Sequence, residues 1–479
     1  MHTYSGILGI FVTLLLSGCM VGPNYQRPQI QLPTKWDSSP SNQNQAEKLI
    51  LQAWWQSFND PVLTALINQA RLGNREIYQA EARVREARAN RDQAIANILP
   101  TLSMNASATK NQPSNASRFG QVGAFSNEYN DYSHSLDASW ELDLFGKRHR
   151  SIESAEASME AAKDEFNDVL VSLFAEVALN YVDVRSYQNQ LAVTKANLAA
   201  QEETYELVSW QEKAGLVSML DVFQAKLTLE NTRSDIPKLR SALEQAKHGL
   251  AVLLGKEPIS LNKLLENTAP IPVVSKQLAV GIPADVLRQR PDVRRSERKL
   301  AAQTAQIGVA EAAAYPSFTL SGSVGVESLL TSNLYTAAAN TFLMAVKSAW
   351  VIFDSGRIRS NVKIQNALQE QALGSYQESV LTALKEVENS LTAYKEEQQR
   401  LEALKASVEA GKSAVELANV QYLSGTADFL KVLDSQKSLL TAQTQVVTSE
   451  AEVTSNVIRL YKALGGGWQV AANSVGLHG

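Results

Sequence analysis

The sequence is poor in cysteine, has no surplus of basic charge, and lacks a hydrophobic segment long enough to cross a membrane as a helix. Its 479 residues include one cysteine, Cys19, which cannot form an internal disulfide. The formal net charge of -4, without a Lys/Arg-rich arm, excludes the basic surface that nucleic-acid binding requires. The apolar run over residues 7–16 is too short to span a bilayer, and no longer run follows. Such a chain can cross a membrane only with the strands of a closed barrel.

The residue patterns of an enzyme or a metalloprotein are also missing. The five histidines are scattered, with no pair at the spacing of metal ligands on a helix. No Gly-rich phosphate loop precedes a helix, and no nucleophile is accompanied by a base. We therefore predict that the protein is not an enzyme and binds no metal and no cofactor.

The position of the single cysteine is informative. The apolar run ends in Leu16-Ser17-Gly18-Cys19, which resembles the bacterial lipobox, where the cysteine is acylated and becomes the new N-terminus. We therefore predict a signal peptide over residues 1–18 and a covalent lipid on Cys19; the alternative is a buried cysteine that follows an apolar run by chance. Residues 1–6 carry no Lys or Arg, unlike most signal peptides. The residue directly after the cysteine is Met20 and not aspartate. By resemblance to the lipoprotein sorting rule, this favours the outer membrane.

Proline is absent from residues 114–236 and 317–479, which permits long helices there. Apolar residues in both stretches step by three or four positions, a spacing typical of coiled coils. The pattern predicts helices over about 148–213 and 357–423, each roughly 100 Å long at 1.5 Å per residue. Antiparallel partners are expected over 218–254 and 428–464, with Pro237 kinking or breaking the first of them.

An internal repeat relates the two halves of the chain. Matched residues lie 210 positions apart, and the pairs are Trp140/Trp350, Gly146/Gly356, Glu176/Glu386, Gly215/Gly425, Leu220/Leu430 and Leu254/Leu464. Upstream, Pro100 matches Pro316 at an offset of 216. The six-residue difference therefore falls between the proline and the tryptophan of each copy, where we expect a loop.

Four short segments alternate apolar and polar residues instead: about 102–109, 135–144, 318–323 and, less strictly, 342–353. In the second, Leu136, Ala138 and Trp140 alternate with serine, aspartate and glutamate. Alternation means one apolar and one polar face, as in a half-buried soluble strand or in a transmembrane barrel strand. Lys347 interrupts the pattern in the fourth such strand. Because even small transmembrane barrels need about eight strands, several copies must pool their strands, although this argument does not fix their number.

Several segments resemble the TolC/OprM family of outer-membrane efflux channels, and in particular its NodT-like lipoproteins. They are residues 18–28, Trp54-Trp55, Asp60-Pro61, 142–148, 287–293, 350–356 and 460–468, so the match spans almost the whole chain. The resemblance implies a mixed α and β membrane protein, with four transmembrane strands and long antiparallel helices in each subunit. It further implies a homotrimer that forms a 12-stranded β-barrel on a 12-helix α-barrel. Its implied partners are outer-membrane lipid, a periplasmic adaptor (membrane fusion protein) and an inner-membrane pump.

The two helical hairpins carry the residues to which the resemblance gives a mechanism. Glycine suits the sharp reversals between helices, and the resemblance adds contact with adaptor hairpins at both tips. These tip residues are Ala214, Gly215, Leu216, Ser424, Gly425 and Thr426. For the gate, Asp434 matches one aspartate of the family's periplasmic constriction, while Lys431 replaces the other. Asp221 and Tyr422 match a pair that holds the closed state; the alternative is that all three are solvated helix-surface residues.

Trp140 and Trp350 stand at matched places in the strands, as aromatic residues at a membrane–water interface do, although ordinary core packing fits them equally well. We predict an outer-membrane channel subunit of a tripartite efflux system that passively exports drugs or other small molecules. The alternatives are a periplasmic coiled-coil adaptor or structural lipoprotein without a pore, and the duct of a type I protein secretion system. The expected plan is a lipidated segment over 19–60, repeats over 61–255 and 284–467, a linker over 256–283 and a tail over 468–479.

Overall fold

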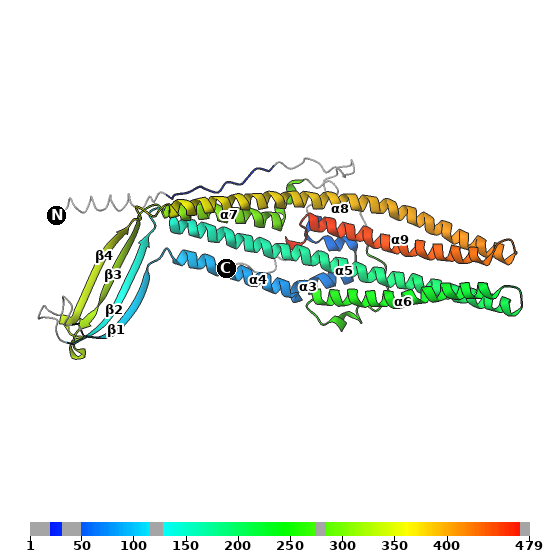
Figure 1. Ribbon diagram of the computed structural model, residues 1–479, viewed down its shortest axis with the longest axis horizontal. Coiled ribbons are helices and arrows are strands. Elements are labelled where there is room, and N and C mark those ends of the chain that lie inside the picture. The colour runs from blue at the N-terminus through cyan, green and yellow to red at the C-terminus, as the bar shows by residue number, and fades with distance from the viewer. Residues whose placement is uncertain (1–19, 31–48, 113, 115–127, 274–283, 470–479) are drawn as a thin grey trace. The chain divides into compact units, whose positions relative to one another are not determined.

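Helices and two β-hairpins alternate along the chain in the computed structural model, which describes residues 20–30, 49–112, 114, 128–273 and 284–469 (Figure 1). The first copy of the repeat contains α3 (Pro61–Gly73), α4 (Arg75–Ala96), β1 (Thr101–Asn111), β2 (Tyr129–Leu142), α5 (Lys147–Lys213) and α6 (Met219–Leu253). The second contains α7 (Pro291–Ala312), β3 (Ser317–Ser328), β4 (Asn340–Ala349), α8 (Arg357–Leu423) and α9 (Phe429–Ala463). Short helices are α2 (Leu49–Gln52), η1 (Trp54–Phe58), η2 (Pro258–Leu261), η3 (Ala284–Gln289), η4 (Thr331–Asn333) and η5 (Ala337–Ala339).

The chain packs as two compact units, and each takes segments from both copies of the repeat. The sheet unit comprises, among the described residues, 20–29, 83–112, 114, 128–162 and 295–376. The helical unit comprises 30, 49–82, 163–273, 284–294 and 377–469. Neither copy of the repeat is therefore a separate folding body.

The four strands form one antiparallel sheet in the order β1-β2-β3-β4. Thr101 pairs with Ser139 in the first hairpin, and Ser317 pairs with Ala349 in the second. These two pairs are related by the offsets of 216 and 210, so both hairpins have the same register. The six-residue difference between the copies thus lies between the two strands of each hairpin.

In this register, all four strands contribute to one apolar face and one polar face of the sheet. Leu136 pairs with Met104 on one side and with Val324 on the other, and Val324 pairs with Phe342. Lys347, which interrupts the sequence alternation, pairs with Thr319 and so lies on the polar face. The apolar face and the outer edges of β1 and β4 have no partner strand in the described part of the chain.

The helices have the bounds that their periodicity predicts, with one correction. Helices α5 and α8 end at Lys213 and Leu423, as predicted. The break considered at Pro237 is wrong, because α6 runs without interruption from Met219 to Leu253. No helix in the described ranges has both the length and the hydrophobicity that crossing a membrane requires.

The N-terminal part of the helical unit is held by aromatic packing and by a capped helix. Trp54 stacks on Tyr461 with ring centroids 5.4 Å apart, and Trp55 meets the edge of Phe174 at 5.1 Å. Asp60 caps α3 by accepting bonds from the backbone N–H groups of residues 62 and 63, at 2.8 and 3.0 Å. The second carboxylate oxygen of Asp60 accepts a hydrogen bond from the Tyr181 hydroxyl at 2.7 Å. These contacts explain the two short motifs of this region that resemble the efflux family.

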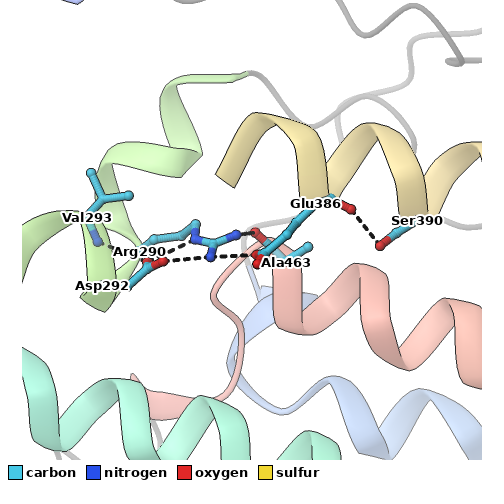
Figure 2. A network of polar contacts seen from close by, with 6 residues as sticks. All are labelled: Arg290, Asp292, Val293, Glu386, Ser390 and Ala463. Carbon is cyan, nitrogen blue, oxygen red and sulfur yellow. Dashed lines mark hydrogen bonds and ion pairs between the residues drawn. The ribbon is translucent and has the colours of Figure 1, made fainter. Parts of the chain in front are cut away.

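A buried arginine joins three helices of the helical unit (Figure 2). Arg290 donates to both oxygens of Asp292, to Glu386 and to the backbone carbonyl of Ala463 at the end of α9. Its counterpart in the first copy is Asn74, which donates to the carbonyl of Leu253 at the end of α6, at 2.8 Å. The same helix end is therefore held in both copies, by an amide in one and by a guanidinium in the other.

Replacing Arg290 with methionine should lower the free energy of unfolding by about 3 kcal/mol, because the change leaves a buried carbonyl and a carboxylate without their donor. The ion pair with Glu386 contributes little to this loss of stability, since the Glu386 side chain is 45% exposed. Denaturant unfolding of detergent-solubilised protein, followed by circular dichroism, measures the difference. The matched control is Lys385→Met, which removes an exposed cation next to Glu386 on α8. A loss no larger than that of the control would contradict a structural role for Arg290.

Candidate functional site

The two helical hairpins end in turns of the same geometry. Gly215 and Gly425 have φ of 72° and 70°, the left-handed region that favours glycine. The N–H of Leu216 donates to the Gln211 carbonyl at 2.9 Å, and the N–H of Thr426 donates to the Gln421 carbonyl at the same distance. These bonds close each helix with a Schellman turn. An added side chain at either glycine would meet no atom within 4 Å, so the constraint there is the backbone angle.

The helix after each turn begins differently in the two copies. Ser218 and Asp221 form a capping box at the start of α6, with the Asp221 carboxylate accepting from the Ser218 N–H at 3.1 Å. The counterparts of these two residues are Asp428 and Lys431. Asp428 makes no side-chain cap bond, and Lys431 places a positive charge in the first turn of α9. Asp221, which the resemblance places at the gate, therefore also stabilises the first turn of α6.

Tyr422 links the two hairpins near their ends. Its hydroxyl donates to the side-chain oxygen of Gln211 at 2.6 Å, which joins α8 to α5. Its ring lies 5.3 Å from the ring of Phe429. The ring packs on a buried cluster made of Val208, Val222, Ala225, Ala418, Phe429, Val432 and Leu433. Gln211 was not predicted as a site residue, although it stands four residues before the tip glycine in one copy, as Gln421 does in the other.

The structure brings Tyr422 and Asp221 close together but gives them different hydrogen-bond partners. Burial, and then the negative charge of Asp221, raise the pKa of the Tyr422 hydroxyl above its usual value. The hydroxyl therefore keeps its proton, and remains a donor to Gln211, throughout the neutral pH range. Asp221 accepts bonds from Ser218, while Tyr422 donates to Gln211.

Asp434 lies apart from this pair, on the exposed side of α9. It lines a groove of about 550 Å³ in the helical unit, together with Asp235, Arg400 and Lys437. Most of the other lining residues are threonines, glutamines and leucines. The groove therefore presents polar groups of both charges. Lys431, the residue at the second constriction position, is also exposed.

Large apolar side chains surround the hairpin ends without being buried in the single chain. Trp210 is 69% exposed and Leu216 is 74% exposed. Other exposed members of this surface are Met219, Leu220, Phe223, Val420, Leu423 and Leu430. Large apolar side chains exposed in one region of the fold are typical of an interaction site. The tip turns were predictable from the sequence, whereas the exposure of Trp210 and Phe223 was not predicted.

The segment that follows Cys19 is bound along the sheet unit, whereas Cys19 itself lies outside the described residues. Arg150 is almost completely buried and donates to the carbonyls of Val21 and Gly22 and to the side chain of Asn24. Gly22 has φ of 89°, and a side chain there would lie 2.4 Å from the backbone of Gly308. The glycine is therefore required both by its backbone angle and by the close approach to α7.

Tyr25 fixes the next part of the same segment. Burial and the neighbouring Glu297 carboxylate raise the pKa of Tyr25 to about 12, so the hydroxyl stays protonated. It donates to Glu297 at 3.1 Å, and Arg27 pairs with the same carboxylate at 2.8 Å. The guanidinium of Arg298 lies over the Tyr25 ring, 5.4 Å from its centroid. The motif over residues 20–28 is thus a binding segment for α5 and α7.

The two tryptophans make equivalent bonds where helix and strand meet. The indole N–H of Trp140 donates to the Ile98 carbonyl at 2.8 Å, and that of Trp350 donates to the Ala314 carbonyl at 3.0 Å. Both acceptors follow the end of a helix, α4 or α7. Both indoles are exposed in the single chain, at 39% and 58%. Among the described residues, no three His, Cys, Asp or Glu side chains are grouped so as to hold a metal ion.

The chain belongs to the outer membrane efflux protein family, as a NodT-like member of the TolC/OprM type. The family model matches residues 66–256 and 282–466, one segment in each copy of the repeat. Nodulation protein T of Rhizobium leguminosarum bv. trifolii is 34% identical over 467 residues, covering 97% of this chain and 98% of that protein. The cation efflux system protein CusC of Escherichia coli is 30% identical over 466 residues, covering 97% and 99%.

Solved structures agree with this assignment. The outer-membrane channel OprN superposes with a TM-score of 0.87 and 35% identity, over 94% of this chain and 100% of that chain. The open state of the Neisseria gonorrhoeae channel MtrE gives 0.82 and 27%, over 94% and 99%. The protein is accordingly an outer-membrane channel subunit of a tripartite efflux system, which confirms the predicted function, the mixed α and β fold of the subunit and the outer-membrane location.

Proposed function

We propose that three copies of the chain form one passive duct, with twelve strands in the outer membrane and a helical tunnel in the periplasm. The observation that carries the proposal is the four-stranded sheet, whose two edges and apolar face have no partner in the described part of one chain. The duct has no enzymatic activity of its own, and its energy comes from the pump. The names of similar proteins mention different cargoes, including toluene, antibiotics and cations. We infer that the pump, rather than the duct, selects the small molecule.

The duct is closed at rest by the link between the hairpin ends. Tyr422 and Gln211 tie α8 to α5, and Asp221 holds the neighbouring turn of α6. Asp434, repeated by the symmetry of the assembly, adds one acidic ring that attracts cations. Because Lys431 stands at the second position, the constriction has one such ring instead of two.

Purified protein in planar bilayers should conduct ions, and Tyr422→Phe should raise the resting conductance. The variant keeps the ring but removes a hydrogen bond of about 1 kcal/mol, so the closed-to-open ratio should fall roughly fivefold for each subunit. The matched control is Tyr394→Phe, whose hydroxyl accepts a bond from Gln398 on the same helix. In a salt gradient, the Asp434→Asn channel should prefer cations over anions less strongly than the wild-type channel, because the substitution removes the acidic ring.

The outcomes of these recordings separate the gate from the channel. Unchanged conductance in Tyr422→Phe and in Asp221→Asn would remove both residues from the gate. A folded oligomer that conducts no ions, even with both substitutions combined, would refute the proposed duct.

The adaptor binds the hairpin ends, through the tip turns and the exposed apolar side chains around them. Leu216→Glu should abolish drug resistance while leaving the channel in the outer membrane, because it places a charge in an apolar contact. Charged substitutions of Gly215 or Gly425 are poorer tests, since they also strain the backbone. The control is Leu72→Glu on α3, a residue that is equally open to solvent. Full resistance in Leu216→Glu cells would refute contact at this tip.

Cys19 carries a covalent lipid at the N-terminus. Because residues 20–28 are bound to α5 and α7, they fix the position at which the lipid is attached. Cells grown with labelled palmitate should transfer the label to the protein, and Cys19→Ser should remove it, because the acyl chains attach through the thiol and the new amino group. The Ser17→Ala variant controls for changes near the cleavage site. An unlabelled wild-type protein would show that Cys19 is an ordinary cysteine.

A further inference from the structure

The junctions between strand and long helix have opposite side-chain chemistry in the two copies of the repeat. In the first copy, Glu141 pairs with Arg148, and Asp143 pairs with His149. The counterparts, 210 positions further along, are Val351 and Ile358 for the first pair and Phe353 and Arg359 for the second. An apolar pair thus stands in place of one ion pair, and Arg359 lacks the carboxylate that its counterpart binds.

A groove of about 490 Å³ lies at the junction of the second copy, inside the sheet unit. The end of α7, the start of α8 and the loop after β4 form its walls. The loop contributes three exposed apolar side chains, since Val351, Ile352 and Phe353 are 50%, 84% and 85% exposed. The groove is therefore an apolar surface that the single chain leaves open to solvent.

Three charged side chains line the same groove. Asp354 accepts bonds from the backbone N–H groups of Gly356 and Ile358, at 2.9 and 2.7 Å, so it caps the start of α8. The other two are Glu311 on α7 and Arg359 on α8, and no ion pair between described residues includes either of them. The groove therefore offers one carboxylate and one guanidinium beside an apolar wall.

The groove adjoins the apolar face of the sheet. Trp350 is the counterpart of Trp140, which pairs with Leu320 on that face. The Trp350 indole donates to the carbonyl of Ala314, and Ala314 lines the groove. Because the proposed duct places the four strands in the outer membrane, the groove stands where the hydrocarbon layer meets the headgroups.

We propose that this groove binds a phospholipid whose headgroup carries an ammonium group, at one site in each chain. The site rests on the proposed duct, which brings the groove to the membrane surface. The Arg359 guanidinium binds the phosphate, and the Glu311 carboxylate binds the ammonium group. An acyl chain covers Val351, Ile352 and Phe353 and removes them from water.

The first copy has no such site. The counterpart of Glu311 is Ile95, and His149 is already paired with Asp143. A phospholipid without an ammonium group fits the second copy less well, because its phosphate would meet Arg359 but leave the Glu311 carboxylate close to a negative charge.

Native mass spectrometry of the purified oligomer tests the headgroup contacts by counting the phospholipids that stay bound. When phosphatidylethanolamine and phosphatidylglycerol are supplied in equal amounts, the wild type should retain the first about fivefold more strongly, the effect of one exposed ion pair. Glu311→Gln should remove this preference, and Arg359→Gln should lower the retention of both lipids. The controls Glu156→Gln and Lys147→Gln change exposed charges of α5 outside the groove and should match the wild type. A preference that persists in Glu311→Gln would contradict the proposal.

Two further variants identify other occupants of the groove. Phe353→Ser should lower the retention of both lipids alike, because it shortens the apolar wall. Dissociation of the oligomer in this variant would instead assign the groove to a contact between subunits. Cys19→Ser should retain phospholipid as the wild type does. Retention that occurs only in Cys19→Ser would show that the protein's own acyl chains fill the groove, and would likewise overturn the proposal.

Planar-bilayer recordings of the same preparation separate this site from the duct on which it rests. A channel that conducts ions but shows no headgroup preference removes the lipid site alone. An oligomer that never conducts removes the proposed duct as well.

Discussion

The two open edges of the four-stranded sheet constrain the rest of the molecule. Backbone N–H and C=O groups along β1 and β4 need partners, and the sheet has one apolar face across all its strands. Pairing between copies meets this need only if each strand leaves its helix at the same place in every copy. The bonds from Trp140 and Trp350 to the ends of the preceding helices fix these places. In the proposed assembly, closure of the sheet is therefore coupled to helix packing at the same junctions.

Two buried arginines hold segments that are distant in sequence. Arg150 binds the backbone of the N-terminal segment in the sheet unit, and Arg290 binds the end of α9 in the helical unit. A guanidinium suits both tasks, because its five N–H donors lie in one rigid plane and reach several acceptors at once. The motifs around Gly22 and Arg290, which resemble family signatures, thus have one chemical explanation.

The sequence predicted the architecture well, because its signals are periodic and occur twice. The repeat, the alternating strands and the helix ends at Lys213 and Leu423 were all accessible from spacing. Contacts between distant residues were not, so neither the partners of Arg150 nor the link from Gln211 to Tyr422 could be predicted. Lys347 looked misplaced because alternation was weak there, and the pairing with Thr319 assigned its face. Of the kink and the break considered at Pro237, the break is wrong, because the packing of a long helix outweighs the low helix propensity of one proline.

The first turns of α6 and α9 are held in different ways. A reciprocally bonded serine and aspartate secure the first turn of α6, and the negative charge suits the positive end of the helix dipole. In α9 the same position is Lys431, whose charge opposes that dipole, and Asp428 makes no cap bond. The start of α9 is held by packing instead, because Phe429, Val432 and Leu433 are buried there, whereas Met219 and Leu220 at the start of α6 are exposed. A duplicated unit has in this way given rise to one hairpin end secured by hydrogen bonds and one secured by apolar packing in every chain.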